Sequence, residues 1–240
     1  MKYAIIAAGE GSRLAAEGIE LPKPLVEVDG KALIDRLIGI FMDNGAEEIV
    51  VICNDMTTLV PRHLIDIQRD GLKGRPIPLR FVVKSTPSSM HSFHALVSQL
   101  PEGRFVMTTV DTIFHPGAFS RYVAEFAADT SADGYMGVTT FIDDEKPLYL
   151  DVDNQDFITA YRDEASAHDR FISAGIYGLS NPGAAAVLNR CIAAGMARMR
   201  RFQRELVTEG WRLKAYDLGK VIDVDHAADI AVAKQLIQSK

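Results

Sequence analysis

The stretch Lys2-Tyr-Ala-Ile-Ile-Ala-Ala-Gly-Glu-Gly-Ser-Arg-Leu14 runs from a continuous apolar segment directly into a glycine-rich turn. The apolar run predicts a buried strand. Gly9 and Gly11 predict a turn in which backbone N–H groups approach phosphate oxygens, because glycine has no Cβ to block them. The turn fits neither the P-loop pattern nor G-x-G-x-x-G, since Leu14 stands where the third glycine belongs. The alternative at this point is a simple strand-to-helix turn.

The first half of the chain alternates β-rich runs with segments of helical period. We expect the strands at residues 2–8, 49–53, 79–83 and 105–110. This alternation predicts a parallel sheet with right-handed crossover helices. Apolar residues at helical spacing mark two of these helices, and Ser88 or Ser89 is the expected N-cap of the second. One stripe consists of Leu33, Leu37, Ile40 and Phe41, and the other of Met90, Phe93, Leu96, Val97 and Leu100.

From about Gly134 onward, strand-like runs follow one another at short spacing, which predicts antiparallel strands added to or beside the sheet. They cover residues 135–141, 148–152, 157–161 and 171–179. Helices are expected at 184–195 and 198–210, short strands at 213–216 and 221–224, and a closing helix at 227–238. No linker or repeat interrupts the chain. We therefore predict one domain over residues 1–240, built from the halves 1–133 and 134–240.

The composition excludes several classes of protein. With 26 Lys plus Arg against 32 Asp plus Glu, the net charge is −6, and no basic stripe offers counter-charge to nucleic acid. No apolar run approaches the ~20 residues of a membrane span, and the first one is too short for a signal peptide. Cys53 and Cys191 lie far apart in apolar segments and indicate buried thiols in a reducing compartment. We expect a cytoplasmic protein without membrane or nucleic-acid partners, and a homo-oligomer is compatible with this.

A second motif, Leu21-Pro22-Lys23-Pro24-Leu25, places a lysine ten positions after Arg13. Together with the glycine-rich turn it resembles the sugar-1-phosphate nucleotidylyltransferase family, the MobA-like NTP transferases. The family pattern is A-A-G-x-G-[ST]-R-[LM] followed by P-K-x-L, and the match covers residues 3–35 almost without gaps. One departure is that Ala15-Ala16-Glu17 stands where the family has Pro and Thr. The resemblance implies a Rossmann-like three-layer α/β/α sandwich with a mixed, mainly parallel central sheet.

The resemblance also implies how the first half binds a nucleoside triphosphate. Arg13 would clamp the β- and γ-phosphates, and Lys23 would reach the α-phosphate and the incoming phosphate. Both are the expected catalytic residues, because phosphoryl transfer is promoted mainly by positioning and electrostatic stabilisation. The expected nucleotide-binding residues are Ala7, Ala8, Gly9, Gly11, Ser12, Arg13, Ser88 and Ser89.

A triphosphate substrate calls for Mg²⁺, which binds one or two carboxylates in addition to water and phosphate oxygens. Asp111 ends an apolar strand, at the sheet edge where ligands usually bind. Near the C-terminus, a strand of period two would place Asp223 and Asp225 on one face. We expect Asp111, Asp225 and Asp223 as metal ligands, with Asp225 favoured over Asp223. Asp229 would lie at N3 of the closing helix as a capping residue, with His226 as N-cap.

The sequence indicates the residues that bind the acceptor substrate less clearly than those that bind the nucleotide. The strand around Ser173 and Gly175 resembles the family's [NST]-x-G-[IVL]-Y segment, whose glycine lets the backbone approach the substrate, although a core strand with a bulge is the alternative. Hexose 1-phosphate enzymes carry Glu-Lys-Pro just upstream, where this chain has Arg162. The triplet Glu145-Lys146-Pro147 comes two strands too early, and we interpret it as a turn. The expected substrate-binding residues are Arg162, Ser173, Gly175 and Lys220.

These features favour a Mg²⁺-dependent nucleotidyltransferase that couples a nucleoside triphosphate to a sugar 1-phosphate and releases pyrophosphate. Two alternatives stay open. One is a CTP-dependent cytidylyltransferase acting on phosphocholine or a similar phosphoalcohol, because the hexose lysine is missing. The other is a non-catalytic nucleotide-binding regulatory module, which would be marked by loss of the Arg, Lys or Asp positions. The sequence leaves the base and the acceptor undetermined.

Overall fold

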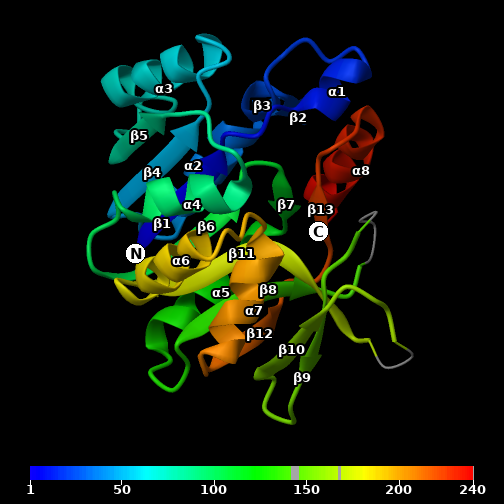
Figure 1. Ribbon diagram of the computed structural model, residues 1–240. Helices are drawn as coiled ribbons and strands as arrows, with labels where there is room; N and C mark the ends of the chain where they lie inside the picture. Colours follow the sequence, from blue (N-terminus) through cyan, green and yellow to red (C-terminus); the bar gives the residue numbers. More distant parts are fainter. Residues whose placement is uncertain (142–145, 167–168, 240) are drawn as a thin grey trace.

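The structure is a computed structural model that describes residues 1–141, 146–166 and 169–239 (Figure 1). Among these residues, nine strands form one mixed sheet, whose main path runs β10-β9-β11-β6-β1-β4-β5. The parallel part comprises β1 (Lys2–Ala7), β4 (Glu48–Cys53), β5 (Leu79–Val83) and β6 (Gly103–Thr109). These are the four strands predicted for the first half, and their parallel pairing is confirmed.

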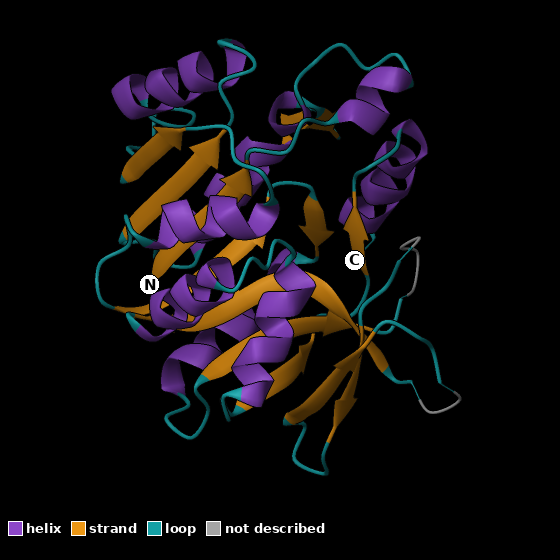
Figure 2. Cartoon of the chain, viewed as in Figure 1, coloured by secondary structure: helices purple, strands orange, loops and turns teal. Residues whose placement is uncertain are grey.

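Helices cover both faces of this sheet (Figure 2). Successive residues of β1 point to opposite faces, so Tyr3 and Ile5 join one apolar cluster while Ala4 and Ile6 join the other. The first face is covered by α2 (Leu33–Asp43), α3 (Leu59–Asp70), α5 (Pro116–Ala128) and α8 (Ala227–Gln238). The second is covered by α4 (Ser89–Val97), α6 (Gly183–Ala193) and α7 (Met199–Thr208). The expected three-layer α/β/α sandwich is confirmed.

The second half extends the same sheet with strands of both directions. The long strand β11 (Phe171–Asn181) runs antiparallel to β6 and joins the two halves. It also pairs antiparallel with β8 (Gly134–Thr139) and β9 (Tyr149–Val152), and β9 pairs antiparallel with β10 (Ile158–Arg162). At the far side β12 (Leu213–Asp217) lies parallel to β8. The division into one domain with two halves stays a prediction, and Glu145 of the predicted turn lies outside the described residues.

Short elements near the carboxyl ends of the parallel strands complete the fold. Strand β13 (Val221–Asp223) pairs with β7 (Thr112–Phe114) in a two-stranded sheet of its own, away from the main sheet. The sequence analysis did not predict β7, since three residues are too few to show a period. The others are α1 (Ser12–Ala16), the 3₁₀ helix η1 (Lys23–Leu25), β2 (Glu27–Val28) and β3 (Lys31–Ala32).

Both cysteines are buried free thiols, as expected. Ser88 is the N-cap of α4, and its side chain accepts a hydrogen bond from the backbone of His91. Within the described part of the chain, no helix is long and apolar enough to cross a membrane.

Candidate active site

A pocket of about 510 Å³ opens at the carboxyl ends of β1 and β6. The glycine-rich turn after β1, η1, the loop that enters α4, and Asp111 form its walls. The predicted nucleotide-binding residues that line it are Ala8, Gly9, Gly11, Ser12, Arg13, Ser88 and Ser89. Ala7 does not line it, because it is the last residue of β1 and its side chain is buried in the core. Residues from Ala8 to Asp111 converge at this pocket because the parallel strands end at one edge of the sheet.

Gly11 is the residue that fits the turn against the lysine motif. Its φ is +65°, in the left-handed region that favours glycine. A Cβ at this position would lie 3.1 Å from Cβ of Lys23. At Gly9, by contrast, a Cβ would meet no protein atom within 4 Å. Gly11 thus brings the turn close to η1, while Gly9 leaves open space on the side of the pocket.

Lys23 lies at the centre of the site and is almost completely buried. Its ammonium group forms ion pairs with the carboxylates of Asp111 and of Asp225, the latter at 2.6 Å. Burial by itself would lower the pKa of Lys23, but the two carboxylates outweigh it and raise that pKa. Lys23 is therefore held as a cation at the point where the first and last parts of the chain meet.

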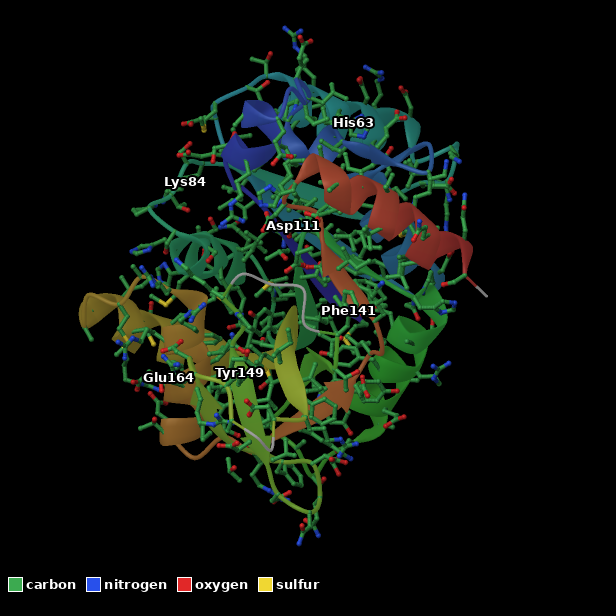
Figure 3. All side chains as sticks on the ribbon, turned by 90° about the vertical axis from the view of Figure 1, so that its right-hand side faces the viewer. His63, Lys84, Asp111, Phe141, Tyr149 and Glu164 are labelled. Atoms are coloured by element: carbon green, nitrogen blue, oxygen red, sulfur yellow. The ribbon has the colours of Figure 1, made fainter. Side chains whose placement is uncertain are left out.

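Arg13 on α1 reaches the same carboxylate group from the other side. Its guanidinium donates to the second oxygen of Asp225 at 2.8 Å. Burial opposes ionisation of Asp225, but the hydrogen bond from Lys23 and the nearby positive charges lower its pKa. Figure 3 shows Asp111 near the middle of the molecule, beside the last helix. The two predicted catalytic cations and two of the predicted metal ligands form one cluster.

Asp223 also lies in this cluster, but the backbone between Asp223 and Asp225 differs from the predicted strand. The period-two strand predicted for both aspartates ends at Asp223, so Asp225 is not on a strand with it. Instead, the chain turns and the N–H of Asp225 donates to the carbonyl of Asp223 at 3.1 Å. Neighbouring protein atoms that limit the hydration of its carboxyl group, followed by the negative charge of Asp111, raise the pKa of Asp223. The prediction that the two lie on one strand face is wrong, although both remain in the same cluster.

A smaller pocket of about 110 Å³ adjoins the cluster on the acceptor side. Arg13 and Asp225 line both pockets, and Ser173 and Asp223 line the smaller one. Gly175 lies at an irregularity of β11 with φ +70°, and a Cβ there would lie 3.4 Å from the hydroxyl of Thr112. The irregularity fits the alternative of a core strand with a bulge, and the approach of the backbone to a substrate at Gly175 stays a prediction.

Two predicted acceptor residues lie differently. The ammonium of Lys220 is 4.0 Å from the ring centre of Phe141, which lines the smaller pocket, so Lys220 lies at its rim. Arg162 on β10 lines neither pocket. Its guanidinium forms ion pairs with Asp151 and Asp169 instead. Lys220 thus lies next to a residue of the smaller pocket, and its role toward a substrate stays a prediction, whereas Arg162 is not brought to the cluster.

Three supporting residues were missed by the sequence analysis. The amide of Asn54, directly after β4, donates to the carbonyls of Ala8 at 3.3 Å and Gly9 at 3.0 Å and so fixes the turn. Gln203 on α7 is buried and accepts a hydrogen bond from Ser173 at 2.9 Å. Glu17 reaches the first turn of α8. Asn54 could have been identified from sequence, because it is a polar residue directly after a predicted parallel strand.

The carboxylates fit a divalent cation that is also bound by substrate. Asp111 and Asp225 already converge on one positive group, the ammonium of Lys23. Among the described residues, no three His, Cys, Asp or Glu side chains are close enough to enclose an ion by themselves. Mg²⁺ does not need such a cage, because one or two carboxylates suffice when phosphate oxygens complete its shell. Asp111 and Asp225, with Asp223 beside them, are the residues that could hold it.

The fold and this site define a class, the α/β proteins of nucleotidyltransferase type. The chain belongs to the family described as MobA-like NTP transferase domain, whose sequence model matches residues 3–175. This assignment agrees with the expected resemblance, and the matched region carries Arg13, Lys23 and Asp111 but ends before Asp225.

Comparison with individual proteins agrees with this assignment. The chain is 34% identical over 116 residues to N-acetylmuramate alpha-1-phosphate uridylyltransferase of Caulobacter vibrioides, covering 48% of each chain. It is 27% identical over 116 residues to UTP–glucose-1-phosphate uridylyltransferase AglF of Haloferax volcanii, covering 48% of this chain and 45% of that one. The match thus spans about half the length of these curated relatives. The inositol-1-phosphate CTP transferase of T. maritima shares the fold with a TM-score of 0.76 at 17% identity, covering 99% and 98% of the two chains.

Proposed function

We propose that this chain is a Mg²⁺-dependent nucleotidyltransferase that joins a nucleoside triphosphate to a sugar 1-phosphate, giving a nucleoside diphosphate sugar and pyrophosphate. The observation that carries the proposal is the cluster of Lys23, Arg13 and Asp225 where the two pockets meet. Two cations at such a junction suit a reaction in which a phosphate on one side attacks a phosphate on the other.

The residues have separate roles in this proposal. The turn from Ala8 to Ser12, which Asn54 holds in place, binds the triphosphate through backbone groups. Ser88 and Ser89 line the other side of the same pocket. Arg13 holds the β- and γ-phosphates, and Lys23 stabilises the charge that develops on the α-phosphate. An acceptor phosphate oxygen bonds to the α-phosphorus while the bond from phosphorus to pyrophosphate breaks. No side-chain nucleophile is needed for this step.

Mg²⁺ is part of the proposal. When bound, it would neutralise phosphate charge and help orient the leaving pyrophosphate. Asp111 and Asp225 are the residues that would hold it.

The position of Arg162 supports a second candidate, a cytidylyltransferase for a smaller phosphoalcohol. Its guanidinium is paired with Asp151 and Asp169 and does not line the acceptor pocket. No replacement for the hexose-binding lysine of the family is therefore available from this residue. Lys220 at the rim of the pocket is the remaining candidate cation for the acceptor phosphate.

The experiment that tests the proposal is a pyrophosphate-release screen. The four ribonucleoside triphosphates are combined with a panel of sugar 1-phosphates and phosphoalcohols, with and without Mg²⁺. If CTP with a phosphoalcohol is the one combination that turns over, the second candidate is favoured. Tight triphosphate binding without turnover of any pair would favour the regulatory module and overturn both enzyme proposals.

A further inference from the structure

Glu17 occupies the position at which the chain departs from the family pattern, and its side chain bridges two distant segments. One carboxylate oxygen lies 2.6 Å from Nδ1 of His226, and the other accepts the backbone N–H of Ala227 at 2.6 Å. His226 and Ala227 begin α8, more than 200 residues further along the chain. Figure 1 shows α1 and α8 side by side at one end of the molecule.

The first turn of α8 is also connected to the candidate active site. The carboxylate of Asp229 accepts hydrogen bonds from the backbone N–H groups of Asp225, at 2.9 Å, and His226, at 2.6 Å. This confirms the capping role expected for Asp229. Asp225 is therefore fixed by the same turn that Glu17 contacts.

Helix α1 buries little of its own surface in the core. It consists of five residues, and Leu14 is its one buried side chain. A helix of this length is not stable on its own, because forming its first turn costs more than one hydrogen bond returns. Arg13 on this helix is half exposed and pairs with Asp225. If phosphates draw Arg13 from that carboxylate, the contacts of Glu17 still connect α1 to α8.

We propose that Glu17 is a positioning residue that holds α1, and with it Arg13, against the start of α8 so that Arg13 meets the triphosphate. This inference rests on the proposed function, because it assigns Arg13 to the phosphates. Glu17 holds α1 in place through two hydrogen bonds, one to the His226 ring and one to the Ala227 backbone.

The test is direct binding of each nucleoside triphosphate to the whole chain, measured by calorimetry without acceptor. Glu17→Ala should weaken binding about tenfold, the loss expected for hydrogen bonds to a charged group. Glu17→Gln should stay within about twofold of the unaltered protein, because its oxygen and amide N–H can serve the same two partners. Glu20→Ala changes an exposed glutamate three positions further along, is the matched control, and should bind as the unaltered protein does.

A second variant separates positioning from simple capping of α8. In Glu17→Ala/His226→Ser, serine is a good N-cap and restores the end of the helix, but it does not reach α1. We expect the melting temperature to recover and triphosphate binding to stay weak. Recovery of binding in this double variant would show that Glu17 only caps α8 and would overturn the inference.

Hydrogen exchange in the ligand-free protein gives a readout that does not depend on the proposed function. Amides of residues 12–17 should exchange faster in Glu17→Ala than in the unaltered protein, and equal rates would overturn the inference. If the unaltered protein binds no triphosphate while exchange still responds to Glu17, the proposed function fails and the anchoring of α1 stands. If triphosphate binds equally to the unaltered protein and to Glu17→Ala, the inference fails and the proposed function stands.

Discussion

The ammonium of Lys23 lies 2.6 Å from a carboxylate oxygen of Asp225, although 202 positions separate the two residues in the chain. The same ammonium also pairs with Asp111. In the proposed function, this buried cation would supply positive charge to the triphosphate and would hold the two carboxylates close together before Mg²⁺ binds. Lys23 and Arg13 place positive charge locally at the pocket, although the chain has a net charge of −6.

Lys23→Ala is predicted to reduce kcat/KM by roughly 100- to 1000-fold, the range typical for loss of a group that stabilises charge in the transition state. The physical reason is that no other buried cation reaches both carboxylates and the nucleotide pocket among the described residues. Steady-state kinetics check this, with circular dichroism to confirm the fold. Lys31→Ala, on the exposed strand β3, is the control and should keep full activity. Near-normal turnover in Lys23→Ala would contradict the site assignment.

The two glycines of the turn should respond differently to alanine. Gly11→Ala should lower the free energy of unfolding by about 1–2 kcal/mol, because a Cβ is disfavoured at φ +65° and would press on Lys23. Gly9→Ala should leave stability nearly unchanged but weaken triphosphate binding, because its Cβ would project where only a ligand can be. Urea unfolding and calorimetric titration measure the two effects. Equal stability of both variants would show that the turn does not need the left-handed conformation.

Removal of divalent metal by a chelator is predicted to abolish turnover, and added Mg²⁺ to restore it. Asp111→Asn and Asp225→Asn should each raise the Mg²⁺ concentration for half-maximal activity about tenfold or more, because each removes a charged ligand. The measurement is activity against Mg²⁺ concentration at fixed triphosphate. Asp66→Asn, exposed on α3, serves as the control and should leave the Mg²⁺ curve in place. Activity that persists in excess chelator would rule out the proposed cofactor.

Stability should depend on pH through an ion pair far from the site. His63 on α3 lies 2.6 Å from a carboxylate oxygen of Asp35 on α2, and this hydrogen bond, against partial burial, raises the pKa of His63 above 6.5. Because the folded pKa is the higher one, the stabilisation is complete below pH 6.5 and is lost as pH rises through the folded pKa. The pair is partly exposed, so the effect should stay below about 1 kcal/mol.

Urea unfolding of the unaltered protein and of His63→Gln between pH 5.5 and 9 measures this contribution. The difference in unfolding free energy should be largest at the acidic end and shrink toward pH 9. A difference that grows with pH would mean that the histidine is destabilised in its charged form. Activity at one fixed pH should be the same in both proteins, because Figure 3 shows His63 well apart from Asp111.

The local pattern of residues was sufficient for much of the fold. The apolar runs that became β1, β4, β5 and β6 are bounded by turn residues and alternate with helical stripes, and this pattern leaves few topologies other than a parallel sheet. The glycine turn, Arg13, Lys23 and Asp111 also follow from sequence, because they lie within short motifs or directly after a strand. Asp229 could be placed because capping acts over three residues.

Other features depend on contacts between distant segments and could not be predicted in this way. Strand β7 is only three residues long, and it exists because it pairs with β13. Asp225 leaves the strand on which Asp223 ends, and its place is set by α8 and Lys23 rather than by a period of two. Arg162 matches the family position in sequence, yet Asp151 and Asp169 hold its side chain away from the pocket.

The sequence by itself determined most of the strands and helices, the glycine turn and the types of charged group at the site, because these are set by spacing and by residue chemistry over short distances. Only the tertiary structure decided that Glu17 reaches α8, that Asn54 holds the turn, and that Lys23 lies between Asp111 and Asp225. The physical reason is that ion pairs and hydrogen bonds across 46 to 210 positions depend on how the crossovers place the strand ends, which no local pattern encodes.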